Sequence, residues 1–291
     1  MGLYVTVICM MNFVDSWALR LMEAGAVLNY GATRAGGSFS YAVGAMVFGT
    51  VVARWGFRPG IPVLAGLWLL LCAVALTIPN PPPPVQSAPK VTLRRGLTAL
   101  APNRVYWTML AAMFLCTLAT CSMESFYSVL ILSMGGTEQH VGFAMFLQAM
   151  SELPVMIFYT RIRKRLGCSS AALMAAAMLC YGVKAILLGC TGSLTVVIAA
   201  ALLQSLSFAL FTPACVDFML ETVPRTYLAT AHLLFLALGQ GAASVAGNSL
   251  SGFLSEQLGI HVMFQLVSLL ALAAGGLAWY SATLWKRRHA P

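Results

Sequence analysis

The sequence predicts an all-α, polytopic membrane protein with about eight full transmembrane helices and an amino-terminal stub. Apolar residues make up 60% of the 291 residues and charged residues only 9%, whereas a soluble domain carries about 25% charged residues. Apolar stretches of roughly 20 residues recur along the chain, and each is long enough to cross about 30 Å of hydrocarbon as a helix. The short alternating strands of a membrane barrel do not occur.

The amino-terminal segment predicts a stub rather than a full span. Residues 2–14 are apolar but too few to cross a membrane, and they have neither the basic start nor the cleavage site of a signal peptide. Residues 15–29 place Trp17, Leu21 and Leu28 at helical spacing among charged side chains, which is typical of an interfacial helix. We therefore expect the chain to begin at the end of a helix whose first half is missing.

The rest of the chain divides into two predicted bundles joined by a linker. Residues 1–79 form a partial bundle, in which 37–53 and 61–78 are full spans. Residues 80–103 contain a proline run followed by Lys90, Arg94 and Arg95, and we expect an extended, solvated, basic linker. Residues 104–291 form a complete bundle of six spans, which we place at 105–134, 141–160, 169–189, 194–220, 227–254 and 260–285.

The basic residues predict the orientation of these spans. Of the 17 Lys and Arg residues, 14 lie on one side of the membrane if the linker is cytoplasmic, two (Arg54 and Arg58) lie on the other, and Lys184 lies within a span. Cytoplasmic loops carry an excess of Lys and Arg, so the linker and the carboxyl terminus are predicted to be cytoplasmic in the cell membrane. Membrane orientation, rather than nucleic-acid binding, therefore explains the net charge of +9.

Three stretches carry a family resemblance. YGATRAGGSFSY (30–41) opens the first full span with the pattern YGxxRxxGSxxY, SELPVMIFYTRIRKRLG (151–167) ends in a basic loop, and 220–259 holds a turn followed by a small-residue helix. With six spans after a basic linker, these features resemble the major facilitator superfamily. The similarity is to the branch that includes phenylpropionate permeases, nucleoside:proton symporters and lactose-permease-like transporters.

The resemblance implies twelve helices in two halves and transport by alternating access. The full spans here would correspond to helices five to twelve, and residues 2–14 to the end of helix four. We therefore expect the chain to lack the first three and a half helices, two of which (one and four) line the transport path in that family.

Glu124 is the leading candidate for a pathway residue. It belongs to a polar stripe with Thr120 and Tyr127 at three- and four-residue steps, which predicts one polar helix face toward a water-filled cavity. Ionisable groups inside a membrane are costly and by default mark pathways or partners. Contact with the solute, acceptance of a proton, and a structural carboxylate paired to a neighbouring helix remain open as roles for Glu124.

Further polar residues occur within the predicted spans. Glu152 follows Gln148 by one turn, and either helix stabilisation or proton coupling fits it. Lys184 lies at a depth similar to that of Glu124, so that the two could pair. The resemblance implies that its helix, the ninth of that family, is peripheral, which favours snorkelling or a structural bond.

Two neutral stripes and one group of charges complete the candidates. The stripes contain Gln204 and Phe211 on one span and Gln240 and Asn248 on the next; they fit either cavity lining or hydrogen bonds between helices. For Asp217 with Glu221, a solvated helix end is the favoured interpretation and a gating salt bridge the alternative. The charges that are candidates for a gate or for structural anchors are Arg34, Arg161, Lys164, Lys184 and Asp217.

Motifs of membrane enzymes and ATP-driven pumps are missing from the sequence: it has no HExxH, GxSxG or Walker A pattern, and no CxxC pair that would suggest a metal. We therefore expect no enzyme activity and no cofactor. The interpretation is secondary active transport of a small organic solute by alternating access, with proton symport as a coupling mode that Glu124 and Glu152 would allow. The alternative is a truncated remnant without transport activity, or a membrane protein for interaction or sensing.

Overall fold

The computed structural model describes residues 30–77 and 93–289, and all of its regular elements there are helical. Eight helices in this part of the chain are long and apolar enough to cross a membrane, which confirms the predicted number of full spans. Six spans are single helices: α2 (Tyr30–Trp55), α3 (Gly60–Thr77), α5 (Arg104–Ser133), α6 (Glu138–Leu166), α7 (Ser170–Cys190) and α12 (Ile260–His289). The predicted stub at 2–14 and the segment 15–29 lie outside the described residues.

Two spans are interrupted in their first halves. One runs from α8 (Leu194–Ala199) through the 3₁₀ segment η1 (Ala200–Ser205) into α9 (Phe208–Thr222). The other follows the short turn η2 (Arg225–Tyr227) and runs from α10 (Leu228–Leu234) through the π-helical segment η3 (Phe235–Ala242) into α11 (Ala243–Leu258). Irregular helix at membrane depth is tolerated where protein or a cavity surrounds it, and π-helical turns are frequent at functional sites.

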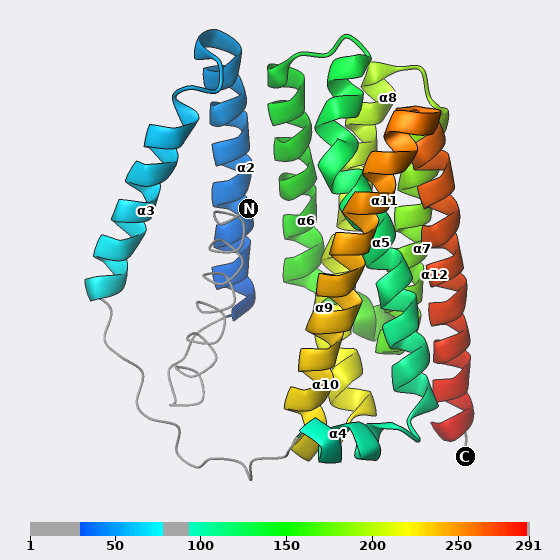
Figure 1. Cartoon of the computed structure of the whole chain (residues 1–291). Coiled ribbons are helices and arrows are strands. Elements are labelled where there is room, and N and C mark those ends of the chain that lie inside the picture. Colours follow the sequence, from blue (N-terminus) through cyan, green and yellow to red (C-terminus); the bar gives the residue numbers. More distant parts are fainter. Residues whose placement is uncertain (1–29, 78–92, 290–291) are drawn as a thin grey trace.

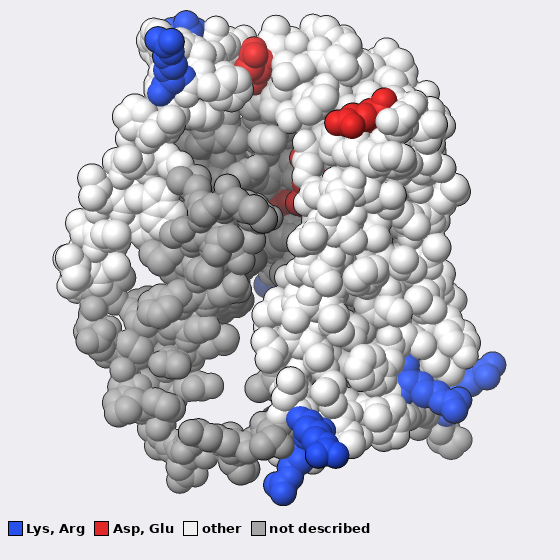
Figure 2. Space-filling view, in the orientation of Figure 1, with Lys and Arg blue, Asp and Glu red and all other residues white. Residues whose placement is uncertain are grey.

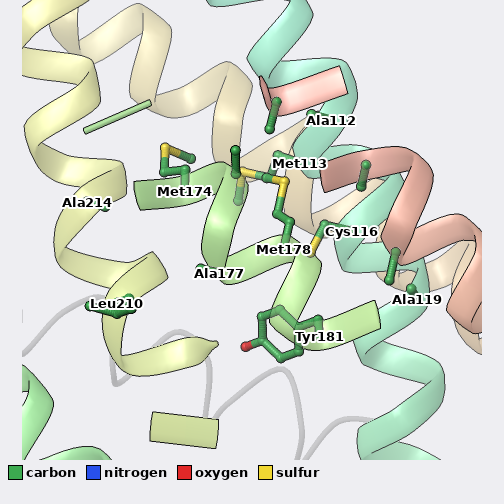
Figure 3. Packing of buried hydrophobic residues seen from close by; sticks show 14 of the residues in the cluster. Ala112, Met113, Cys116, Ala119, Met174, Ala177, Met178, Tyr181, Leu210 and Ala214 are labelled. Atoms are coloured by element: carbon green, nitrogen blue, oxygen red, sulfur yellow. The ribbon is translucent and has the colours of Figure 1, made fainter. Parts of the chain in front are cut away.

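The last six spans share one hydrophobic core. α12 packs along both α7 and α5 (Figure 1), and the small residues Gly182 and Gly275 let α7 and α12 approach closely. Methionines fill the interior, where Met113, Met174 and Met178 lie beside alanines of α5 and α7 (Figure 3). Unbranched methionine side chains fit irregular gaps between helices of this kind.

Helices α2 and α3 form a hairpin beside that core, and only one face of it is packed. α2 runs along α6 (Figure 1), where Gly49 meets Gly142. A Cβ added at Gly142 would lie 2.8 Å from the Ala45 carbonyl oxygen and 3.1 Å from the Gly49 Cα, so the two backbones are in direct contact. α3 buries none of its residues against the described chain.

Only one of the four glycines in this part of α2 lies in a close helix contact. The helix already begins at Tyr30, so α2 starts seven residues before the predicted limit of the span at 37 and includes the whole YGATRAGGSFSY stretch. Gly36, Gly37 and Gly44 have no described atom within 4 Å of an added Cβ, and Ser40 is exposed. Of these glycines and Gly49, only Gly49 permits a close approach, because it is the position that faces α6.

The predicted linker is not irregular throughout. Its last part is helix α4 (Leu93–Leu100), which lies across the end of the six-span core (Figure 1). Gly96 and Leu100 are buried while Arg94 and Arg95 are exposed, so the short helix is amphipathic. Residues 90–101 contain no proline, which leaves the backbone donors of this segment available for helix formation.

We expect Gly49→Ala to loosen the contact between α2 and α6. The added methyl group would lie 3.0 Å from the Glu138 carbonyl oxygen and 3.0 Å from the Gly142 Cα, and backbone atoms cannot rotate away. Overpacking of this kind costs about 1 to 3 kcal/mol. Amide hydrogen exchange of α2 in the purified chain measures the effect and should become faster.

Gly44→Ala is the matched control, because no described atom lies within 4 Å of its added Cβ. Alanine is the better helix former, so exchange of α2 in this variant should be unchanged or slower. Equal acceleration in the two variants would contradict the close contact.

Candidate functional site

A polar face in the second half of α5 meets a polar face in the first part of α11. Glu124 and Ser125 on α5 are exposed, and Thr120 one turn away is partly exposed. Figure 2 shows a hollow between the larger body of the molecule and the smaller part beside it, with a few acidic atoms visible inside. Glu124 is therefore exposed within a membrane-spanning helix. That its stripe faces a water-filled cavity stays a prediction.

Two hydrogen bonds join these faces. Ser125 Oγ donates to Asn248 Oδ1 at 2.7 Å, and the Cys121 thiol donates to Ser244 Oγ at 3.1 Å. Gln240, one turn before Ser244, is exposed. The sequence left two interpretations of this stripe open, cavity lining and hydrogen bonds between helices. The hydrogen bonds are present, and Gln240 and Asn248 are also exposed.

The other side of the same helix serves packing. Ala243, Gly247 and Ser251 are buried at four-residue steps, and a Cβ added at Gly247 would lie 2.5 Å from the Leu118 carbonyl oxygen. Small residues at this spacing bring two helix backbones together. The close packing sets the distance at which the polar side chains of α5 and α11 meet.

Tyr127 leaves the stripe that the sequence predicted. Its side chain is 4% exposed, and its hydroxyl donates to the Val197 carbonyl oxygen at 2.8 Å, so it points into the bundle instead of the hollow. At Tyr127 the polar stripe of α5 borders the buried face of that helix. A periodic pattern cannot tell which of two adjacent faces such a residue takes.

Lys184 does not snorkel. Its side chain lies in the bundle, and the residue is 5% exposed. Its ammonium donates to Gln204 Oε1 at 2.8 Å and to Gln148 Oε1 at 3.5 Å, and it lies 5.6 Å from the centre of the Tyr127 ring. The structural bond that the sequence allowed is therefore present, but its partners are amides; the described residues contain no ion pair between Lys184 and Glu124.

The remaining predicted pathway residues are mostly buried. Gln204 is 3% exposed and bonds between helices, so it does not line the hollow. Glu152 is 7% exposed and lies one turn after Gln148 on α6. Phe211 is partly buried against the hydrophobic core. In the described residues no group of three or more His, Cys, Asp or Glu side chains is arranged to hold a metal ion.

A second polar cluster lies at the end of the bundle nearest α4. Arg163 on α6 forms ion pairs with Asp217 and Glu221 on α9, and the three side chains are 29%, 29% and 24% exposed. Tyr159 donates to Asp217 Oδ2 at 2.9 Å, and Ser170 at the start of α7 donates to Glu221. The two acids are therefore paired, in contrast to the solvated helix end that the sequence favours.

The basic residue of this cluster is not one that the sequence singled out. Arg161 and Lys164 are exposed, and the Arg161 guanidinium carbon lies 5.4 Å from the Phe158 ring centre. Arg163 follows the buried Tyr159 by four residues and therefore shares its face, a spacing that could have identified it. Arg34 belongs to α2, and its side chain lies outside the described part of the chain.

Comparison with known proteins agrees with this architecture. The model of the MFS_1 like family matches residues 2–266. The chain is 28% identical over 256 residues to a maltose permease of Geobacillus stearothermophilus, which covers 88% of this chain and 63% of the permease. It is 23% identical over 261 residues to YwbF, an uncharacterized transporter of Bacillus subtilis, covering 90% of this chain and 64% of YwbF.

The chain thus spans less than two thirds of the length of these relatives. The family match nevertheless covers most of this sequence, and the helical architecture and eight apolar spans agree with it. The protein is a multi-pass membrane protein that belongs to the MFS_1 like family of the major facilitator superfamily.

Proposed function

We propose that the protein takes part in secondary active transport of a small organic solute by alternating access. The observation that carries this proposal is Glu124, a carboxylate exposed at mid-span on the polar seam between α5 and α11. A charge inside a membrane is expensive and is retained mainly where it faces an aqueous path or a partner. The family match supports transport in general.

The groups around Glu124 suit a solute rich in hydroxyl groups. Ser125, Asn248 and Gln240 offer neutral donors and acceptors on the exposed side of the seam. Neutral polar groups orient an uncharged solute without the desolvation cost of a further charge. One relative is named a maltose permease, so sugars are the first solutes to test.

Proton symport is the coupling mode that these residues support. Glu124 on α5 and Glu152 on α6 both lie inside spans. A carboxylate that gains a proton loses the charge that makes its place in the hydrocarbon region costly, so the site can change its exposure more easily once it is protonated. In this scheme the α2–α3 hairpin and the six-span core are the two moving units, and the Gly49–Gly142 contact is where they turn against each other.

The cluster around Arg163 would hold one end of the six-span core. It links α6 to α9 directly and to α7 through Ser170. The positive-inside pattern favours a cytoplasmic location for this end, together with the linker and the carboxyl terminus. In this proposal the ion pairs are a gate or brace at the cytoplasmic end, with Asp217 and Glu221 as the acidic partners.

We expect Glu124→Gln to abolish proton-driven accumulation of the solute. The amide keeps the size and hydrogen-bonding groups of the side chain but can neither carry the charge nor exchange the proton. The measurement is uptake of radiolabelled maltose and other sugars into proteoliposomes that contain the full chain, with and without an imposed proton gradient.

Glu256→Gln is the matched control, because Glu256 is exposed near the end of α11. Its uptake should equal that of the unmodified protein. Accumulation by the Glu124 variant at the unmodified rate would remove Glu124 from the mechanism. Absence of uptake by the unmodified chain would favour the alternative of a membrane protein without transport activity.

Arg163→Gln should destabilise the end of the core nearest α4. The substitution leaves Asp217 and Glu221 close together without their cation, and the loss should be about 1 to 3 kcal/mol because the cluster is only partly exposed. Denaturant titration in detergent micelles measures the loss. Arg165→Gln, at an exposed position two residues later, should change stability by less than about 0.5 kcal/mol. Similar losses in both variants would show that the ion pairs contribute nothing specific.

A further inference from the structure

Helix α4 carries an apolar stripe that the described protein covers only in part. Leu100 at the end of the helix is 1% exposed, whereas Leu93 at its start is 53% exposed. The two leucines are seven residues apart and therefore share one face. Arg94 and Arg95, next to the exposed leucine, are exposed as well. One end of α4 thus presents an uncovered apolar side chain together with two positive charges.

Two contacts hold α4 where the spans end. A Cβ added at Gly96 would lie 2.6 Å from Thr230 Cγ2, so the backbone of α4 packs directly on this side chain of α10. Trp107 Nε1 donates to the Leu100 carbonyl oxygen at 3.0 Å. Trp107 lies in the first turn of α5, and tryptophan is enriched where membrane spans meet water. These contacts fix the short helix across the ends of the spans (Figure 1).

The same end of the six-span core carries further basic residues. Arg104 at the start of α5 and Lys286 and Arg287 near the end of α12 are exposed. Ser281 Oγ donates to the Val105 carbonyl oxygen at 2.8 Å, which joins the end of α12 to the start of α5. Figure 2 shows Lys and Arg atoms at the lower end of the molecule with no acidic atoms beside them on this face.

The acidic residues described at this end are already paired. They are Asp217 and Glu221, and both form ion pairs with Arg163. The arginines of α4 therefore belong to a surface with a net positive charge. Such a surface attracts anionic groups, above all the headgroups of an adjacent membrane leaflet.

We propose that α4 is a docking surface for anionic phospholipids. Arg94 and Arg95 bind the phosphate groups, and Leu93 enters the boundary between headgroups and acyl chains, as the apolar face of an interfacial helix does. A lipid fits both features of this end of α4, because a soluble anion has no apolar part to cover the leucine.

A lipid bound in this way also acts on the bundle. α4 packs on α10 through Gly96 and Thr230, and α10 leads into the π-helical segment η3. A headgroup that holds α4 in place therefore holds the start of this interrupted span. The inference does not depend on transport of a solute, and its test reads only local order and lipid binding.

The test measures amide hydrogen exchange of residues 93–100 in the full chain, held in zwitterionic micelles to which phosphatidylglycerol is added. Exchange should slow as the anionic lipid binds, and phosphatidylcholine with the same acyl chains should have little effect. The double variant Arg94→Gln, Arg95→Gln should need at least about tenfold more phosphatidylglycerol for the same slowing, because each basic residue near an anionic surface strengthens binding severalfold. The double variant with lysine at both positions keeps the charge and should retain most of the response.

The matched control is the double variant Arg54→Gln, Arg58→Gln, which removes the same charge from exposed positions at the turn between α2 and α3. Its response should equal that of the unmodified chain. Leu93→Ser leaves every arginine in place and should still weaken the response, because the apolar contact with the lipid is lost.

Three results would overturn the proposal. One is equal slowing by phosphatidylcholine, and another is an unchanged response in the glutamine variant of α4. The third is full slowing by inorganic phosphate alone, which would identify a site for soluble anions instead of a lipid surface.

Discussion

Polar groups inside a bilayer have no water to bond, and this constraint organises the six-span core. Its clearest expression is Lys184, whose charge is surrounded by amides from two other elements and by an aromatic ring. The same constraint explains why Ser125 and Asn248 meet across α5 and α11 and why the Tyr127 hydroxyl reaches a carbonyl oxygen. Each of these polar contacts also connects two different spans.

Close helix contacts make these polar bonds geometrically possible. On α11 the buried Gly247 lies directly against the Leu118 backbone of α5, and the exposed Asn248 lies on the adjoining face. One face of α11 therefore packs against α5, and the adjoining face carries the polar side chains. The interrupted spans extend this pattern, since η1 carries Gln204 to Lys184 and η3 carries Gln240 to the exposed side. In each of these spans the irregular segment carries a glutamine, Gln204 in η1 and Gln240 in η3.

Residues that the sequence placed together are separated in the structure according to the face they occupy. Glu124 lies on the exposed side, as its stripe predicted, whereas Tyr127 turns inward. Among the basic residues after Tyr159, Arg163 pairs with the two acids while Arg161 and Lys164 remain exposed. Steps of three and four residues define a broad arc of the helix. Only the neighbouring helices decide where that arc changes from exposed to buried.

The sequence by itself determined the number and approximate limits of the spans, because crossing hydrocarbon requires long apolar helices whatever their arrangement. It also carried the family resemblance and predicted the polar faces of α5 and α11. The tertiary structure decided that Gly49 is the contact glycine of α2, that residues 93–100 form a helix, and that Lys184 bonds amides. These outcomes depend on which helix lies opposite each residue. Such contacts join positions that are often far apart along the chain, and local composition and periodicity contain no information about them.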